Sequence, residues 1–186
     1  MKIYFLSKNE HKLREIRSFL EPYGFEVEIM FEDKVEIQSD NLAEIVKKAV
    51  EFVGPRKYAF FAEDAGLFID HLNGFPGPYS SYVYKTIGID GILKLMLGVE
   101  DRKATFRSAI ALFHPKLDEI KVFEGHVEGV ISTEKRGTEG FGFDPIFIPR
   151  GESRTFAEMS LEEKNRYSHR ARAVKKMLDF LLEFKF

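Results

Sequence analysis

Apolar runs of strand length recur along the chain. Alternate residues are apolar in 25–30, 104–113 and 119–132, which is typical of strands with one buried face. Other runs are continuously apolar over four or five residues, which indicates more deeply buried strands. The ranges that we expect to form strands are 3–6, 25–30, 58–63, 66–70, 104–113 and 119–132, with a short strand inside 134–150.

Segments with apolar residues three and four positions apart predict amphipathic helices between these strands. The ranges that we expect to be helical are 7–22, 41–54, 88–97 and 160–184. Three helices begin with residues at capping-box spacing, namely Ser7 with Glu10, Asn41 with Glu44, and Ser160 with Glu163. Gly and Pro are frequent in 71–81, so we expect a loop there. Together these elements predict an α/β protein with a mixed sheet.

The composition narrows the class of protein. The chain has 186 residues, 44% of them hydrophobic, which suits a single domain with a sizeable core. We expect two lobes, with 75–135 forming much of the second. No apolar run is long enough to span a membrane, and a net charge of -2 does not indicate a nucleic-acid-binding surface. Cysteine is absent, which excludes disulfides and thiolate catalysis, and we expect a cytoplasmic protein.

Two adjacent acids follow the apolar run at 58–62. Glu63 and Asp64 repel each other and resist burial unless a positive charge lies near them. Neighbouring strand residues point to opposite faces, so we expect the strand to end or bulge at Gly66, which would let both acids enter one site. With Glu36 they could hold Mg²⁺ and leave one carboxylate to activate water. Unrelated surface acids are the alternative in a chain with 30 Asp and Glu residues.

A polar turn joins the first strand to the first helix. Such a turn directs backbone N–H groups and the helix dipole beyond the end of the strand. Ser7 and Asn9 add side-chain donors, and Lys8 and Lys12 add positive charge, which makes the turn a candidate phosphate site. It lacks the glycines and the Lys-Ser/Thr pair of a P-loop, and an ordinary capped helix is the alternative.

The segment 140–145 reads Gly-Phe-Gly-Phe-Asp-Pro. An aromatic ring on a flexible loop can stack on a nucleobase, and Phe141 is the candidate, although it could equally belong to the core. We expect Phe143 to be a core residue. Asp144 either accepts hydrogen bonds from ring N–H groups or begins a turn.

Polar and basic side chains are concentrated near the C-terminal end. Lys164, Ser168, His169, Arg170 and Arg172 fall within about two helical turns. Lys164 and Ser168 are four residues apart, so they would share one face of a continuous helix. These donors could bind phosphate or the keto oxygen of a base. A solvated helix face paired with neighbouring glutamates is the alternative.

In this order, these stretches strongly resemble the inosine triphosphate pyrophosphatase family, whose members act on dITP, ITP and XTP. The resemblance spans nearly the whole chain and is carried by SKNEHK at 7–12, EIQ at 36–38, EDAGL at 63–67, GFGFDPIF at 140–147 and SHRARA at 168–173. It implies hydrolysis between the α and β phosphates, which releases a monophosphate and pyrophosphate. It also implies an elongated α/β molecule with two lobes and a central cleft, usually a homodimer.

The resemblance further implies roles for individual residues. Asp64 would accept a proton and would bind Mg²⁺, or Mn²⁺, together with Glu36 and with Glu63 as helper. Phe141 would stack on the base with Asp144 near its edge. The residues implied in substrate binding are Ser7, Lys8, Asn9, Glu10, His11, Lys12, Lys48, Ala65, Phe141, Gly142, Phe143, Asp144, Lys164, Ser168, His169 and Arg170.

Recognition of a 6-keto purine has a simple physical basis. A pocket of donors bonds the keto oxygen of hypoxanthine or xanthine but places donor against donor when it meets the amino group of adenine. A buried donor left unpaired costs roughly 1–3 kcal/mol, so two of them give a large preference.

The chain also departs from the family pattern. Lys8 stands where many members have glycine. After the segment PGPYS, members often carry Lys or Arg, but here Ser81 and Tyr82 follow and Lys85 is the nearest basic residue, which puts one triphosphate contact in doubt. Two other functions stay open: a hydrolase for modified pyrimidine or methylated nucleotides, and a nucleotide sensor without catalysis. The three acids argue against a pure sensor.

Overall fold

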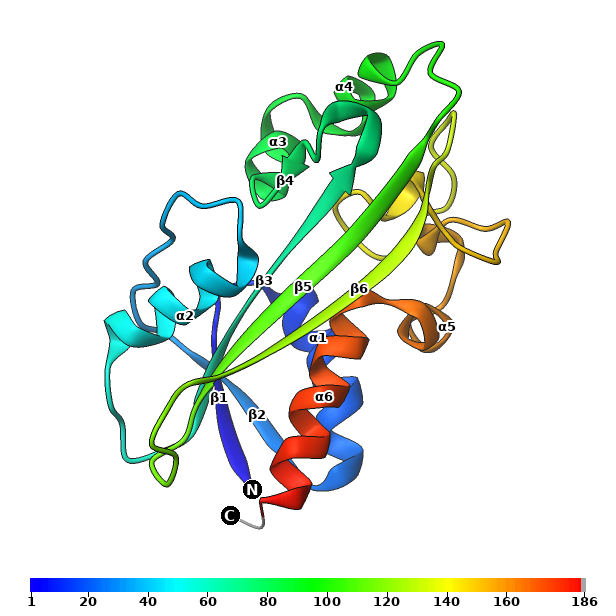
Figure 1. Ribbon diagram of the computed structural model, residues 1–186. Coiled ribbons are helices and arrows are strands. Elements are labelled where there is room, and N and C mark those ends of the chain that lie inside the picture. Colours follow the sequence, from blue (N-terminus) through cyan, green and yellow to red (C-terminus); the bar gives the residue numbers. More distant parts are fainter. Residues whose placement is uncertain (185–186) are drawn as a thin grey trace. The chain divides into compact units, whose positions relative to one another are not determined.

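The computed structural model describes residues 1–184 and confirms the predicted mixed α/β fold (Figure 1). The strands are β1 (Lys2–Leu6), β2 (Glu26–Met30), β3 (Phe60–Ile69), β4 (Pro76–Gly77), β5 (Lys103–Phe113), β6 (Lys121–Ile131) and β7 (Phe147–Pro149). The helices are α1 (Glu10–Leu20), α2 (Leu42–Val53), α3 (Ser80–Thr86), α4 (Gly88–Leu95), α5 (Leu161–Tyr167) and α6 (His169–Glu183). Short 3-10 helices are η1 (Glu21–Tyr23), η2 (Asp70–Leu72), η3 (Asp144–Ile146) and η4 (Phe156–Glu158).

Within residues 1–184, seven strands form one sheet in the order β2-β1-β3-β5-β6-β7, with β4 paired to β3. Strand β1 runs parallel to β2 and β3, whereas β4 is antiparallel to β3 and β7 is antiparallel to β6. No helix in this part of the chain is both long and apolar enough to cross a membrane.

The chain divides into two compact units. Unit 1 comprises Met1–Asp64, Ser108–Gly125 and His169–Phe186, and unit 2 comprises Ala65–Arg107 and His126–Ser168. Strands β3, β5 and β6 contribute residues to both units, so the chain crosses from one unit to the other within these strands and again between Ser168 and His169.

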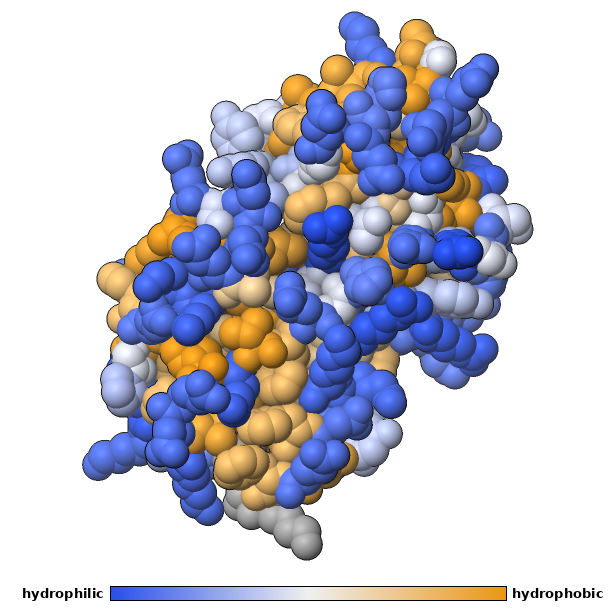
Figure 2. Space-filling model, viewed as in Figure 1, coloured by the Kyte–Doolittle hydropathy of each residue, from blue (hydrophilic) through white to orange (hydrophobic). Residues whose placement is uncertain are grey.

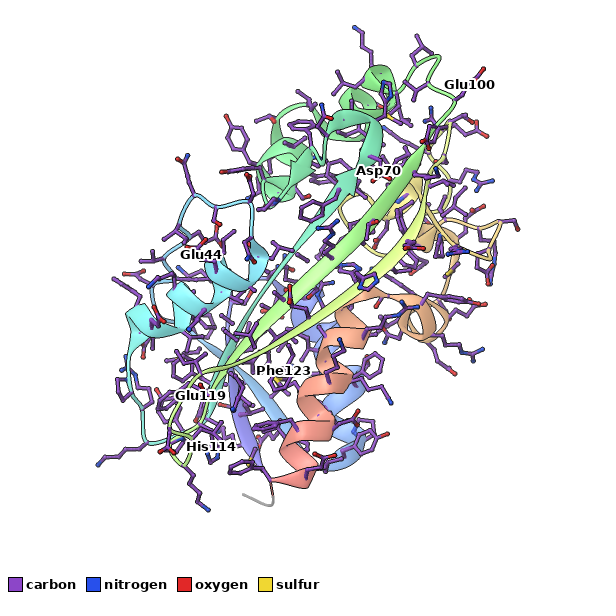
Figure 3. All side chains as sticks on the ribbon, viewed as in Figure 1. Glu44, Asp70, Glu100, His114, Glu119 and Phe123 are labelled. Carbon is purple, nitrogen blue, oxygen red and sulfur yellow. The ribbon has the colours of Figure 1, made fainter. Side chains whose placement is uncertain are left out.

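The core of unit 1 lies between its strands and the adjacent pair of helices α1 and α6, whereas α2 covers the other side of these strands (Figure 1). The rings of Phe5 and Phe61 stack with centroids 4.9 Å apart. Phe123 on β6 packs against Phe180 on α6 at 5.5 Å (Figure 3). Other buried members of this core are Ile3, Leu13, Ile16, Val27, Ile110, Val174 and Met177.

Unit 2 has a separate core that is rich in phenylalanine. The ring centroid of Phe147 lies 4.7 Å from that of Phe106 and 5.2 Å from that of Phe156. Phe143 is only 3% exposed, which confirms its predicted core position, and its ring makes a T-shaped contact with that of Tyr84, with centroids 5.5 Å apart. Each unit therefore has its own set of buried apolar residues.

Two of the predicted helix starts are confirmed. The side-chain oxygen of Asn41 accepts hydrogen bonds from the backbone N–H groups of Ala43 and Glu44. Ser160 and Glu163 form a reciprocal capping box, at 2.9 and 3.2 Å, at the start of α5.

The predicted start of the first helix is wrong by two residues. Asn9, not Ser7, is the N-cap of α1, because its side-chain oxygen accepts a hydrogen bond from the N–H of Lys12 at 3.1 Å. The hydroxyl of Ser7 instead accepts a hydrogen bond from the N–H of Asn9. Both side chains therefore shape the turn that precedes the helix.

The predicted break at Gly66 is also wrong, because β3 continues without interruption from Phe60 to Ile69. A Cβ atom at Gly66 would lie 2.2 Å from the carbonyl oxygen of Gly77 on β4. Glycine is required here by the close approach of a neighbouring backbone, which a single sequence does not distinguish from a strand end.

The range 160–184 contains two helices, not one. Ser168 has extended dihedral angles (φ -65°, ψ 147°) and separates α5 from α6. Lys164 and Ser168 consequently do not share the face of a continuous helix, and their contact is a backbone bond from the N–H of Ser168 to the carbonyl of Lys164.

The range 71–81 was expected to be a loop, but it contains β4 and the start of α3. Ser80 anchors α3: its hydroxyl accepts a hydrogen bond from the N–H of Leu67 and donates one to the carbonyl of Gly77. This contact between distant segments stabilises a short helix that the local composition does not favour.

The surface agrees with the 31% share of charged residues. On the face shown in Figure 2, hydrophilic residues are interspersed with smaller apolar patches. Some large apolar side chains are nevertheless strongly exposed, among them Leu97 at 84% and Phe31 at 79%.

We predict that Gly66→Ala lowers the free energy of unfolding by about 1–3 kcal/mol, because the added methyl group collides with backbone that cannot move aside freely. Denaturant unfolding measures the change. The control is Ala65→Gly, which alters the adjacent position without adding atoms and should cost less than about 1 kcal/mol. Equal stability of Gly66→Ala and the wild type would contradict the close approach of β4.

Candidate active site

The acidic pair has a positive partner in unit 1. The ammonium group of Lys12, near the start of α1, lies 2.8 Å from Glu63 and 3.7 Å from Asp64. Both acids lie on β3 beyond Phe60 and Phe61, where this strand pairs with β1. One lysine thus contacts two neighbouring carboxylates although the strand does not end there.

Glu63 is also held by two residues that sequence reasoning did not assign to it. Arg170 on α6 donates a hydrogen bond to its carboxylate at 3.0 Å, and Ser108 on β5 donates another at 2.7 Å. A further glutamate, Glu15 on α1, forms an ion pair with the guanidinium of Arg170. All these side chains are buried, so removal of any one charge would leave its partner uncompensated in the interior of unit 1.

These neighbours fix the charge of Glu63. Burial on its own raises the pKa of the carboxyl group, but the positive charges of Arg170 and Lys12 outweigh it and hold the pKa well below its usual range. Glu63 therefore remains ionised across the physiological pH range and is a constant negative counter-charge for Lys12 and Arg170.

Asp64 is in a different electrostatic environment. Burial raises the pKa of its carboxyl group; Lys12 and Lys34 oppose this rise, whereas Glu63 and Glu36 add to it. Glu36 forms an ion pair with Lys34 at 2.9 Å, and its side chain is 64% exposed. Asp64 thus has the weaker compensation of the two adjacent acids and the carboxylate better suited to accept a proton.

The turn before α1 can still donate hydrogen bonds to an anion. Ser7 and Asn9 use oxygen atoms as acceptors within the turn, which leaves the Ser7 hydroxyl proton and the Asn9 amide group as donors. Lys8, Glu10 and His11 are exposed around the first turn of the helix. The structure thus brings the predicted phosphate turn together with Lys12 and the two acids.

A second cluster of predicted site residues lies in unit 2. The buried carboxylate of Asp144 forms an ion pair with Lys164 at 2.6 Å and accepts a hydrogen bond from the N–H of Phe141 at 2.9 Å. The ammonium group of Lys164 also lies 5.1 Å from the centroid of the Phe141 ring. Asp144 therefore holds both the ring and the lysine, while Phe141 itself is only partly buried.

Gly140 and Gly142 give this loop its shape. Both have positive φ angles, and a Cβ atom at Gly140 would lie 2.1 Å from a carboxylate oxygen of Asp144. The glycines therefore allow the loop to fold tightly around the Asp144 carboxylate.

The structure also places the remaining predicted site residues. Lys48 is exposed on α2 and pairs with Glu51 at 2.7 Å. Ala65 is the first residue of unit 2 on β3 and is partly buried. Ser168 and His169 are buried at the junction of α5 and α6, one in each unit. Arg170 forms ion pairs with Glu15 and Glu63 within unit 1.

Comparison with known proteins identifies the family. The profile of the Ham1 family matches residues 3–180. The chain belongs to the Ham1 family. A dITP/XTP pyrophosphatase of Thermococcus kodakarensis is 49% identical over 184 residues, which is 98% of each chain, and that of Saccharolobus solfataricus is 50% identical over 186 residues, 97% of this chain and 94% of the relative.

Solved structures of Ham1 proteins share the fold. A HAM1 protein from Coxiella burnetii superposes with a TM-score of 0.85 at 29% identity and covers 98% of this chain and 99% of its own. A structure described as nucleoside-triphosphatase / dITP/XTP pyrophosphatase, from Mycobacterium abscessus, has a TM-score of 0.72 at 35% identity, with coverage of 97% and 100%. The predicted resemblance is therefore confirmed at the level of the family.

Two residues of the site in unit 1, Ser108 and Glu15, were missed in the sequence, although signals for both exist. Ser108 occupies an inward position in a strand whose other inward positions, including Phe106 and Ile110, are apolar. Glu15 lies three residues after Lys12, next to the apolar stripe of α1. A polar residue at a core position is more informative than an apolar residue on the surface.

We predict that Glu63→Gln lowers the free energy of unfolding by about 3 kcal/mol or more, because Lys12 and Arg170 lose a buried counter-charge. Chemical denaturation measures the loss. Glu51→Gln, which removes an exposed partner of Lys48, is the matched control and should change stability by less than about 1 kcal/mol. Similar small losses in the two variants would show that the buried cluster is unimportant for stability.

The Glu63→Gln variant also tests the charge of Glu63, through the pH dependence of the free energy of unfolding. A carboxyl group whose folded pKa lies below its unfolded value of about 4.3 stabilises the fold above that value, and the stabilisation disappears as the pH falls towards the folded pKa. Wild-type stability should therefore fall on acidification below about pH 4.5, and Glu63→Gln should show a smaller fall.

Proposed function

We propose that this chain hydrolyses the non-standard purine nucleotides ITP, dITP and XTP to the monophosphate and pyrophosphate. The observation that carries the proposal is the position of Lys12, at the start of a helix and within 3.7 Å of both Glu63 and Asp64. This cluster combines an anion-binding helix start with one carboxylate, that of Asp64, whose raised pKa suits it to accept a proton. The dITP/XTP pyrophosphatases of Thermococcus and Saccharolobus, which are similar over nearly their whole length, support the substrate class.

Unit 1 supplies the residues for the polyphosphate. Hydrolysis of a phosphoanhydride depends mainly on the positioning and charge neutralisation of the phosphates. Lys12, the donors of Ser7 and Asn9, and the first N–H groups of α1 would bind phosphate oxygens. The carboxylate of Asp64 would take the proton of the attacking water, which its raised pKa favours.

Glu63 and Arg170 act on this site through Lys12. Arg170 pairs with Glu63 and with Glu15, and Ser108 donates a hydrogen bond to Glu63. These contacts fix the carboxylate of Glu63, which lies against the ammonium group of Lys12. We therefore assign Glu63 and Arg170 as positioning residues, in place of the roles in metal binding and base recognition that the resemblance implies for them.

The residues fit a divalent cation of the Mg²⁺ type, with Mn²⁺ as an alternative. Within residues 1–184, no group of three or more His, Cys, Asp or Glu side chains is arranged to hold a metal. Mg²⁺, however, is commonly bound by one or two carboxylates together with substrate phosphates. Asp64 and Glu36 would hold it, because Asp64 is a partly buried acid that has other acids as neighbours. The cation would supply charge neutralisation at the phosphates.

Unit 2 supplies the residues for the base. Phe141 offers a partly exposed ring for stacking, and Lys164 offers donors to a keto oxygen. Asp144 holds both of them in place, so its carboxylate serves the base site mainly through Phe141 and Lys164.

A homodimer acting on the cytoplasmic nucleotide pool stays a prediction. Membership of the Ham1 family and the presence of strongly exposed apolar side chains, such as Tyr82 at 70% and Leu97 at 84%, support an association between copies.

The proposed substrate class can be tested with a panel of ITP, dITP, XTP, GTP, ATP and dTTP in the presence of Mg²⁺. We expect pyrophosphate rather than orthophosphate to be released, and kcat/KM for the three non-standard purine nucleotides to exceed that for ATP by more than about 100-fold. Preferred turnover of dTTP would support the alternative hydrolase. Binding without turnover of any nucleotide would support a sensor.

We predict that Asp64→Asn lowers kcat for dITP by at least about 100-fold while dITP binding changes much less, because the proton acceptor is lost but the phosphate donors remain. Steady-state kinetics and equilibrium binding measure the two effects. Asp70→Asn alters an exposed acid that follows β3 and should keep wild-type activity (Figure 3). An active Asp64→Asn variant would overturn the assignment of the base.

A further inference from the structure

Tyr84 on α3 is an aromatic residue of unit 2 to which no role has been assigned. Its ring makes a T-shaped contact with that of Phe143, with an interplanar angle of 90° and centroids 5.5 Å apart. Phe143 is buried whereas Tyr84 is 43% exposed, so the contact joins a core ring to a ring at the surface of unit 2. Within residues 1–184 the hydroxyl of Tyr84 makes no hydrogen bond, so the ring alone makes this contact.

Phe143 belongs to the loop that presents Phe141, the candidate for stacking on the base. Only Gly142, with a positive φ of 61°, separates the two phenylalanines. Phe141 and Asp144, which flank this pair of residues, are bonded to each other: the N–H of Phe141 donates to the Asp144 carboxylate at 2.9 Å, and the N–H of Asp144 donates to the carbonyl of Phe141 at 3.2 Å. Phe143 therefore lies inside a closed turn, and a shift of its ring would displace Phe141 as well.

The helix that carries Tyr84 is itself fixed within unit 2. The hydroxyl of Ser80 bonds to the backbone of β3 at 2.8 Å and to that of β4 at 2.7 Å. Val83, the residue before Tyr84, is buried in the core of this unit. A ring on a helix that is held at these two points has a defined position, so it can limit the movement of the loop that it contacts.

We infer that Tyr84 is a positioning residue for base recognition, which holds Phe143 in place and thereby keeps Phe141 in position to stack on the purine. The inference rests on the proposed function, because Phe141 stacks on a base only if the chain binds a nucleotide. Every contact that carries it lies within unit 2. Without the ring of Tyr84 the loop would adopt more conformations, and nucleotide binding would have to restrict them again.

The test compares Tyr84→Ala, Tyr84→Phe and Ile87→Ala with the wild type. Phe keeps the ring and removes only the hydroxyl, whereas Ala removes the ring. Ile87 follows α3 directly and is 46% exposed, so its replacement is a matched control for the loss of an exposed side chain from this helix. Calorimetry with IMP measures base binding, calorimetry with inorganic pyrophosphate measures polyphosphate binding, and steady-state kinetics gives KM and kcat for ITP and ATP.

We expect Tyr84→Ala to weaken IMP binding and to raise KM for ITP by about five- to tenfold, as the loss of an aromatic pair allows. Pyrophosphate affinity and kcat for ITP should stay within about twofold of the wild type, because the ring acts on the base and not on the phosphates. The preference for ITP over ATP in kcat/KM should fall, since a poorly stacked purine is also poorly aligned with the donors that select it.

The two other variants should behave like the wild type within about twofold. Tyr84→Phe restores the ring contact, and Ile87→Ala leaves it untouched. Thermal unfolding of each variant verifies that the fold is kept. Tyr84→Leu, which keeps apolar volume without a ring, serves for the same measurements if the Ala variant is unfolded at the assay temperature.

Two results would overturn the inference. In one, folded Tyr84→Ala or Tyr84→Leu binds IMP and prefers ITP over ATP as the wild type does. In the other, Tyr84→Phe loses as much affinity as Tyr84→Ala, which would show that the hydroxyl contacts the ligand directly. A wild-type protein whose IMP binding depends on the Tyr84 ring but which hydrolyses no nucleotide would refute the proposed function and leave the inference standing.

Discussion

The candidate site in unit 1 depends on the buried carboxylate of Glu63. A carboxylate that is 1% exposed is stable only when positive charge and hydrogen bonds replace the water it has lost, and Lys12, Arg170 and Ser108 do so. These partners come from α1, α6 and β5, so the same interaction that compensates the charge ties three elements to β3. It also fixes the ammonium group of Lys12 beside Asp64.

Unit 2 also contains a buried carboxylate that holds neighbouring residues in place, but its partners are different. The buried carboxylate of Asp144 pairs with Lys164 and accepts the N–H of Phe141, which fixes a ring and a cation side by side. In each unit a buried acid is therefore an internal partner of residues that we propose to bind the nucleotide, namely Lys12 in unit 1 and Phe141 and Lys164 in unit 2.

Much of this arrangement could be predicted from the sequence. The strand and helix pattern, the Asn41 and Ser160 caps and the core position of Phe143 follow from local periodicity and composition. Three features could not be predicted: the continuity of β3 at Gly66, the N-cap at Asn9 and the break at Ser168. Each depends on contacts between segments or on a choice among several capping residues. Arg170 shows the same limit for the site, because its ion-pair partners Glu15 and Glu63 come from elements far away in the sequence and could not be inferred from its motif.

The most direct test of the account is a double-mutant cycle on kcat/KM for dITP with Lys12→Met, Glu63→Gln and the combined variant. If Glu63 serves the reaction by holding Lys12, each single substitution lowers kcat/KM and Glu63→Gln causes little further loss once Lys12 has been replaced, as is found for residues that act as a unit. Independent effects that multiply in the combined variant would contradict the claim that Glu63 acts through Lys12.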